Sequence, residues 1–334
     1  MANIVPCQSP LHVPCDLAFL AEAPGEDEED KGKPLVGPAG KVFNAGLRAA
    51  GIDRAKAWVG NVFDVKAPGN DVGPWIKSQG FHKPHLDRLR RELEEAQPTV
   101  IVPMGDTALW ALTGQGNIMK RRGGVELATH LVPGVKIVPT VHPSYVQRQW
   151  EFLIVFVWDL LRAKREAKVG PGLVVPVRRF LICPTVEDVR RYVEGVLLKA
   201  DMISLDIETG WGQITSVGLG PGAEEAMCIP FVDVRSSTKS YWGTVDEEVE
   251  VWRLIRRVCE SPIPKIGQNV SSFDAFWLLD RMGIKVMGLT HDTRLMSHAL
   301  FPQLPKDLAT LAGSFGTQGQ WKHWTKGGTE KRDD

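Results

Sequence analysis

Short apolar segments alternate with amphipathic helical patterns along the first half of the chain. The apolar segments, at 17–20, 57–62, 99–103 and 135–139, have the length of buried strands. The helical patterns lie at 41–50, 82–96, 105–113 and 150–167. Strands that are separated by helices favour a parallel sheet with helices on both faces. We therefore expect an α/β domain with three αβα layers at residues 1–168.

A second series of strand and helix patterns follows a break that is rich in glycine and proline. The sequence Gly170-Pro171-Gly172 closes a basic helix and predicts a linker at 169–172. Strand patterns then recur at 179–183, 202–209, 212–219 and 226–230, with helices at 186–199 and 246–260. A chain of 334 residues is long enough for two domains with separate cores. We expect a second α/β domain at residues 173–334.

Composition and charge narrow the classes of protein. Apolar residues make up 43% of the chain and charged residues 24%, as in globular proteins. The formal net charge is zero, so a nucleic-acid surface would have to be a local patch. The cysteines are few and scattered, which indicates reduced thiols and a cytoplasmic location. The longest apolar run, 152–161, is too short to span a bilayer, so we expect no membrane association.

Polar residues follow several of the predicted strands at the same end. Glu22 and the turn Ala23-Pro24-Gly25 come after the first strand, and Asn61 ends the second. His142-Pro143-Ser144 follows the strand at 135–139. Open α/β sheets build ligand sites at the carboxyl ends of their strands, where glycine lets the backbone approach a flat ligand closely. The alternative is an ordinary strand, turn and helix with a solvated acidic run.

These segments resemble the motifs of the family 4 and 5 uracil-DNA glycosylases. Glu22-Ala-Pro24-Gly25, followed by Pro34-Leu35-Val-Gly37, is similar to the first motif, and His142-Pro143-Ser144 to the His-Pro-Ser motif. The resemblance covers about residues 16–165. It implies that Glu22 stabilises the cationic sugar or activates water, that Asn61 recognises the base edge, and that His142 stabilises the leaving base. It further implies that the other base and DNA contacts come from Ala23, Pro24, Gly25, Leu35 and Ser144.

The chain departs from this family at three positions. Leu35 stands where the family has the phenylalanine that stacks on the everted base, and Ala21 replaces the glycine before the catalytic acid. Family 4 members hold an iron–sulfur cluster with four cysteines, but Val65 occupies the position of the third. Because Cys7 and Cys15 alone cannot hold such a cluster, we expect none. The domain could therefore accept another modified pyrimidine, or only hold DNA.

A basic loop precedes the last predicted strand of the first domain. It contains Lys120, Arg121 and Arg122 followed by two glycines. Such clusters commonly contact the DNA backbone, so we expect phosphate contacts here. A solvated loop without a ligand is the alternative.

Two acids on one predicted strand of the second domain are a candidate cation site. Alternation along a strand places Asp206 and Glu208 on one face, between isoleucine and leucine neighbours. Two adjacent carboxylates in an apolar setting are costly unless a cation neutralises them. A third acid, Asp274, opens a predicted helix shortly after Gln268-Asn269.

This set resembles the DEDD-type 3′–5′ exonucleases, above all the proofreading domain of family A DNA polymerases. The resemblance implies an RNase H-like α/β fold in which Asp206, Glu208 and Asp274 bind Mg²⁺ or Mn²⁺. It also implies that Gln268 and Asn269 position the 3′ strand end and that Asp292 supports the site. No residue here matches the fourth acid of that family, and we expect the chain to stop before it and before any polymerase part.

The sequence thus predicts a DNA replication and repair protein similar to the front of a phage-type DNA polymerase. Its expected activities are removal of uracil or a related base and 3′–5′ end processing. The expected partners are DNA and a polymerase, in a bacterial or phage-infected cell. The alternative is a catalytically weak or inactive module that binds DNA and docks partners in a phage replication complex.

Overall fold

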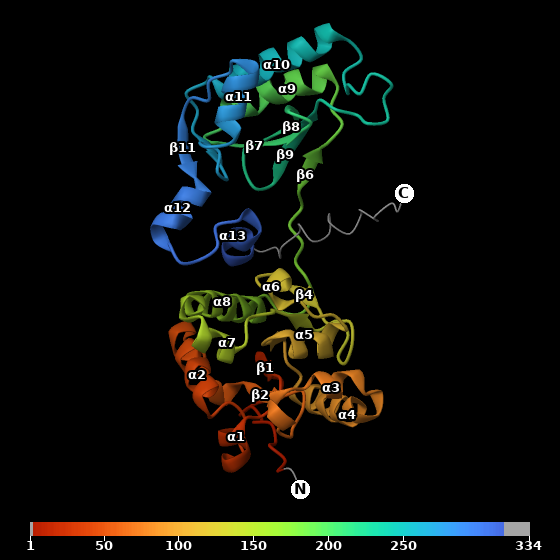
Figure 1. Cartoon of the computed structure of the whole chain (residues 1–334), viewed down its shortest axis with the longest axis vertical. Helices are drawn as coiled ribbons and strands as arrows, with labels where there is room; N and C mark the ends of the chain where they lie inside the picture. Colours follow the sequence, from red (N-terminus) through yellow and green to blue (C-terminus); the bar gives the residue numbers. More distant parts are fainter. Residues whose placement is uncertain (1–2, 317–334) are drawn as a thin grey trace. The chain divides into compact units, whose positions relative to one another are not determined.

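The structure, a computed structural model, describes residues 3–316 (Figure 1). These residues form two compact units, the first made of residues up to Val174 together with 303–316, and the second of Val175–Pro302. The division lies near the predicted linker, but the segment 303–316 groups with the first unit and not with the second. The assignment of separate functional domains to 1–168 and 173–334 stays a prediction. No helix in the described chain is long and apolar enough to cross a membrane.

A five-stranded sheet forms the centre of the first unit, in the order β2-β1-β3-β5-β4. Strands β2, β1, β3 and β5 run parallel, whereas the edge strand β4 pairs antiparallel with β5. The predicted parallel sheet is confirmed, and β4 is an addition that its two residues were too short to signal. The strands are β1 (Leu17–Ala21), β2 (Trp58–Asn61), β3 (Val100–Pro103), β4 (Glu126–Leu127) and β5 (Lys136–Ile137).

Alternate residues of β1 face two different helical layers. Phe19 packs edge-on against Phe43 of α2, with ring centroids 5.1 Å apart. Ala18 and Leu20 point the other way, into a core shared with Leu89 of α4. The three-layer αβα architecture is therefore confirmed. The helices of this unit are α1 (Glu26–Lys31), α2 (Pro38–Ala50), α3 (Gly73–Lys77), α4 (Gln79–Ala96), α5 (Asp106–Thr113), α6 (Ile118–Arg121), α7 (Pro143–Arg148), α8 (Leu153–Val169) and α13 (Leu308–Phe315), with 3-10 turns η1 (Arg54–Lys56), η2 (Pro68–Asn70) and η3 (Trp150–Phe152).

A six-stranded sheet forms the second unit, in the order β11-β10-β7-β8-β9-β6. Strands β7, β8 and β9 make an antiparallel meander, and β10 and then β11 add parallel to β7. This strand order is that of an RNase H-like fold, as predicted. The strands are β6 (Arg179–Leu181), β7 (Ile203–Gly210), β8 (Gln213–Gly220), β9 (Glu225–Pro230), β10 (Lys265–Gly267) and β11 (Leu289–Asp292).

Strand β7 has one buried and one exposed face. Ile203, Leu205 and Ile207 are buried in a core with residues of α9 and α10, while Asp206 and Glu208 lie on the exposed face. The predicted alternation along this strand is confirmed. The helices of this unit are α9 (Val186–Gly195), α10 (Val245–Cys259), α11 (Asp274–Met282) and α12 (Thr293–Leu300), with the 3-10 turn η4 (Leu197–Lys199).

Candidate functional site

The carboxyl ends of the parallel strands in the first unit meet at one cleft. Glu22 follows β1, Asn61 ends β2 directly opposite Ala21, and His142 follows β5 as the residue before α7. All three line a cleft of about 620 Å³, a size suited to a small ligand. The structure thus brings together the residues that the sequence placed in the first site, and the same cleft is also lined by Ala23, Pro24, Gly25, Leu35 and Ser144.

The Glu22 side chain is held by a threonine from another strand end. Its Oε2 accepts a hydrogen bond of 2.5 Å from Oγ1 of Thr107, a buried residue in the first turn of α5. The backbone carbonyl of Glu22 accepts from the N–H of Phe63 at 3.0 Å. The carboxylate therefore has a fixed orientation in the cleft. Thr107 was not identified from the sequence, since nothing local connects it to Glu22.

His142 caps the start of α7 with its own ring. Its Nδ1 accepts from the backbone N–H of Ser144 at 3.1 Å and lies 2.7 Å from the Ser144 hydroxyl. A backbone N–H can only donate, so Nδ1 carries no proton and the neutral ring is protonated at Nε2. Burial, with a smaller contribution from the charge of Arg148, lowers the pKa of His142 to about 4. The imidazole is therefore neutral near pH 7.

Asn61 is fixed from behind by an arginine of α4. Nη2 of Arg88 donates to the backbone carbonyls of Asn61 and Val62, at 3.0 and 2.9 Å. The same guanidinium pairs with Asp64 at 3.2 Å and with Glu92 at 2.7 Å. Asn61 is buried, and its side chain lines the cleft. The end of β2 is thus held in place by α4, and Asn61 with it.

One acid of the run after Gly25 has a structural function. Oε1 of Glu28 accepts from the backbone N–H groups of Val36 at 3.0 Å and Gly37 at 2.7 Å, and Oε2 accepts from that of Gly25 at 3.1 Å. Glu28 is buried, so this carboxylate ties together the two loops that form one wall of the cleft. The alternative of a solvated acidic run is wrong for this residue. Its position three residues after Gly25 was the available signal, because it matches the spacing of a capping box.

The basic loop is largely occupied by internal ion pairs. Arg122 is 1% exposed and its Nη2 lies 3.2 Å from Oδ1 of Asp159, another buried residue. Arg121 pairs with Glu126, which leaves Lys120 as the exposed cation of the loop. The expectation that Arg122 contacts phosphate is therefore wrong. The physical reason is that a buried carboxylate in α8 requires a cation beside it, and Arg122 supplies it.

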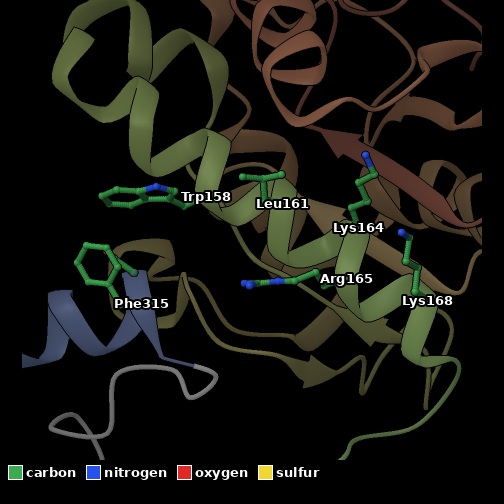
Figure 2. A pocket seen from close by; sticks show the side chains of 7 residues that line it. Trp158, Leu161, Lys164, Arg165, Lys168 and Phe315 are labelled. Atoms are coloured by element: carbon green, nitrogen blue, oxygen red, sulfur yellow. The ribbon is translucent and has the colours of Figure 1, made fainter.

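A separate hollow of about 410 Å³ lies along α8 in the first unit (Figure 2). Figure 2 shows the rings of Trp158 and Phe315 together at one end and Lys164 and Lys168 at the other. The centroids of the Trp158 and Phe315 rings lie 4.9 Å apart. Nζ of Lys164 donates to the carbonyls of Ala50 and Gly51 at 3.0 and 2.7 Å, so this lysine caps α2. The lining contains none of the residues that the sequence predicted for a site.

One acid of the second unit, Asp274, is hydrogen-bonded to the backbone of β7. Asp274 is 2% exposed and its Oδ1 accepts from the N–H of Ile207 at 2.7 Å. Burial, with smaller contributions from the charges of Asp206 and Asp292, raises the pKa of Asp274 to about 6. This carboxyl therefore sits in an environment that opposes its negative charge, next to one of the predicted ligands.

The residues around these acids are already engaged in hydrogen bonds. Asp292 caps α12 and accepts from the N–H groups of Asn269 and Ser271 at 3.0 and 3.2 Å, which fits a supporting position. Oδ1 of Asn269 accepts from Arg294 at 3.1 Å, and the Gln268 side chain accepts from Thr293. Gln268 and Asn269, the residues predicted to position the 3′ end of a DNA strand, are thus held in place by α12.

A divalent cation suits the chemistry of this donor set. Asp206, Glu208 and Asp274 offer only carboxylate oxygens, which Mg²⁺ and Mn²⁺ prefer, and a cation would offset the burial and, to a smaller extent, the neighbouring negative charges that raise the pKa of Asp274. Among residues 3–316, however, no three His, Cys, Asp or Glu side chains are arranged so that they could hold a metal ion. Metal binding by these acids stays a prediction.

Comparison with known proteins connects the first unit with uracil-DNA glycosylases. A family model described as the uracil DNA glycosylase superfamily matches residues 12–162. The type-4 uracil-DNA glycosylase of Thermotoga maritima is 36% identical over 134 residues, which are 40% of this chain and 66% of the relative. The type-4 enzyme of Pyrobaculum aerophilum is 31% identical over 152 residues, 44% of this chain and 74% of the relative.

A viral relative extends beyond the first unit. The DNA polymerase of Bacillus phage SP01 is 28% identical over 200 residues, which are 58% of this chain but 21% of the polymerase. Among solved structures, an EXD2 exonuclease domain is 15% identical over 40% of this chain and 68% of its own, with a TM-score of 0.27, too low to carry weight. The chain thus spans about two thirds of the Thermotoga enzyme and a fifth of the polymerase. The sequence relatives associate it with DNA repair and DNA processing.

Proposed function

Because the chain belongs to the uracil-DNA glycosylase superfamily through residues 12–162, we propose that its first unit removes uracil or a related modified base from DNA. The observation that supports this most is the convergence of Glu22, Asn61 and His142 on one cleft of about 620 Å³, which has room for an everted base. The reaction breaks the N-glycosidic bond of a nucleotide that has been turned out of the stack.

Glu22 faces the developing positive charge of the sugar. As the base departs, the sugar gains oxocarbenium character, and a fixed carboxylate stabilises it or orients the attacking water. The hydrogen bond from Thr107 holds the carboxylate at the end of β1 so that no reorientation is needed during the reaction. Fixed charges of this kind account for much of the acceleration in enzymes.

His142 acts on the other product, the leaving base. A pyrimidine base departs as an anion, and the neutral imidazole of His142 donates from Nε2 to its oxygen. A neutral donor is available across the physiological range because the pKa of His142 is about 4. Asn61 offers both a donor and an acceptor from one amide, which suits recognition of a base edge.

The charges at the mouth of the cleft give the DNA a preferred side. Glu26 and Asp27 line it on the side of α1, whereas Arg148 and Ser144 line it on the side of α7. Phosphates are repelled by the first pair and attracted by the second. We therefore place the DNA backbone along α7, with Arg148 in the role that the sequence had assigned to Arg122.

A second activity is favoured by the acids at β7. We propose that Asp206, Glu208 and Asp274 hold Mg²⁺ or Mn²⁺ for 3′–5′ removal of nucleotides from a DNA end, with a DNA polymerase as partner. Bound metal would activate water and stabilise the leaving oxygen. The residues of the chain supply the rest: Asp274 is fixed on the backbone of Ile207, and Gln268 and Asn269 are fixed by α12. The competing function for the whole chain is DNA holding without catalysis.

An alkali cleavage assay tests the first activity. The protein is incubated with a single-stranded oligonucleotide that contains one uracil, and hot alkali then breaks the strand at any abasic site. We expect breaks with the wild type and their loss in Glu22→Ala and His142→Ala, with retained DNA binding in both. Strands that stay intact with the wild type, together with tight DNA binding, would favour the holding function instead.

A further inference from the structure

An arginine behind the cleft holds the loop that carries Leu35. Arg54 opens the turn η1, and its Nη2 donates to the carbonyl of Pro34 at 2.6 Å while Nη1 donates to that of Leu35 at 2.9 Å. Leu35 lines the cleft, whereas Arg54 does not. Arg54 therefore acts on the wall of the cleft through the backbone, from outside the site.

This loop has a conformation that leucine rarely adopts. Leu35 has a φ of +49°, in the left-handed region that favours glycine, and its side chain is 5% exposed. Such a conformation persists only where the surroundings enforce it. The Leu35 carbonyl oxygen that accepts from Arg54 also lies close to α2, because a Cβ added at Gly40 would be 2.1 Å from it. The Leu35 backbone is thus fixed both by the guanidinium and by close contact with a helix position that only glycine can occupy.

Arg54 is itself fixed by neutral groups. Its Nη1 also donates to Oδ1 of Asn44 at 2.9 Å, its Nε donates to Oε1 of Gln8 at 3.0 Å, and its guanidinium lies 5.4 Å from the centre of the Phe43 ring. Burial lowers the pKa of Arg54. A half-buried cation whose hydrogen-bond acceptors are neutral is costly. The planar guanidinium of Arg54 can donate to two successive backbone carbonyls at once, and this geometry is its contribution to the site.

We propose that Arg54 is a positioning residue that sets the base selectivity of the cleft by holding Leu35 in its left-handed conformation. The inference rests on the proposed glycosylase function. Leu35 stands on the wall against which an everted base lies, so the position of its side chain decides which bases fit. Without Arg54 the loop can relax to an ordinary backbone conformation, and the Leu35 side chain leaves the cleft wall.

Selectivity and loop dynamics are measured in the same set of proteins. Full-length wild type, Arg54→Ala, Arg54→Lys and the matched control Arg48→Ala are compared; Arg48 is an exposed arginine on α2. For each, kcat/KM is determined on oligonucleotides that contain one uracil or one 5-hydroxymethyluracil. Hydrogen exchange of the backbone amides at 33–37 reports the loop directly and needs no activity.

We expect Arg54→Ala to change the ratio of the two kcat/KM values by about tenfold or more, the range that a displaced pocket contact produces. Amide exchange at 33–37 should quicken, and Arg54→Lys should fall between, because lysine keeps the charge without the fork. A general loss of stability would lower both kcat/KM values in parallel. An unchanged ratio with an active Arg54→Ala protein, or unchanged amide exchange, would overturn the inference. A wild type that excises neither base would overturn the proposed function itself.

Discussion

The Nδ1 atom of His142 accepts a hydrogen bond from the backbone N–H of Ser144 at 3.1 Å. This contact determines which form of the imidazole faces the ligand. It requires an unprotonated Nδ1, so the single proton of the neutral ring lies on Nε2. Under the proposed function, His142 therefore acts as a neutral hydrogen-bond donor to the leaving base and not as a general acid.

The first prediction concerns the pH dependence of excision. Because the pKa of His142 is lowered to about 4, protonation of this residue should not affect the single-turnover rate between pH 8 and about pH 5. A histidine with an ordinary pKa would titrate near pH 6.5. A His142-dependent change in rate centred near pH 6.5 would contradict the assignment. The control is Ser144→Ala, which keeps the backbone N–H that donates to Nδ1 of His142.

The same pKa has a consequence for stability. The folded state favours neutral His142, so this residue contributes stability above its unfolded pKa of about 6.5, and that contribution is lost as the pH falls towards 4. Chemical denaturation of wild type and His142→Ala at a series of pH values measures it. The wild type should lose more stability than the variant between pH 6.5 and 4, and parallel curves would show that His142 is not buried in the way described.

Thr107→Val should weaken catalysis without removing the catalytic acid. The substitution keeps the shape of the buried side chain but removes the hydroxyl that donates to Glu22. We expect the excision rate to fall by about tenfold with little change in KM, since a freed carboxylate spends less time in the reactive orientation. Thr129→Val, at an exposed position, is the matched control. Equal excision rates in the two variants would show that Thr107 does not position Glu22 for catalysis.

Glu28→Gln should loosen the wall of the cleft. Glutamine cannot accept at both oxygens, so at least one of the three backbone N–H donors of Gly25, Val36 and Gly37 loses its partner. We expect the unfolding transition of the first unit to lose about 2 kcal/mol, the usual cost of a broken buried bond to a charged group. Glu26→Gln, in the same helix but exposed, should change it by less than about 0.5 kcal/mol.

Asp274→Asn should stabilise the second unit when metal is absent. The pKa of Asp274 is raised from 3.8 to about 6, so its folded form opposes ionisation and stability is lost as the pH rises through this window. At pH 8 in EDTA we expect the variant to be more stable by about 2 kcal/mol. Added Mg²⁺ should stabilise the wild type and not the variant, and Asp280→Asn should behave as the wild type. A less stable Asp274→Asn protein in EDTA would contradict this account.

The sequence was sufficient to place the residues at the ends of the strands. Glu22, Asn61 and His142 each follow a predicted strand of one parallel sheet, and the geometry of such sheets brings those positions together. Alternation alone likewise placed Asp206 and Glu208 on one face of β7. These relationships follow from the period of the strands and the order of the elements.

Contacts between distant segments could not be predicted in this way. Arg122 was predicted to contact phosphate because it lies in a basic loop. Its buried partner, Asp159, lies in the distant helix α8, so the local sequence does not show the ion pair. Glu28 was one acid among several in the sequence. Its structural function depends on the hydrogen bond that it accepts from the backbone N–H of Val36, in the following loop. Nη1 of Arg162 donates to the carbonyl of Gly313 at 2.8 Å. This bond joins α13 to the first unit, although the residues of the second unit lie between the two segments in the sequence. Each case depends on a buried contact between segments that are distant in the sequence, and only for Glu28 does a local pattern, the capping-box spacing from Gly25, give a hint of it.

The most direct test of the account is to identify the product. Equimolar protein is mixed with an oligonucleotide that contains one uracil, and mass spectrometry follows free uracil and the remaining strand over time. The account predicts release of free uracil and an intact abasic strand with the wild type, and neither product with Glu22→Ala or His142→Ala. Free uracil that still appears with both variants, or no free uracil with the wild type, would contradict it.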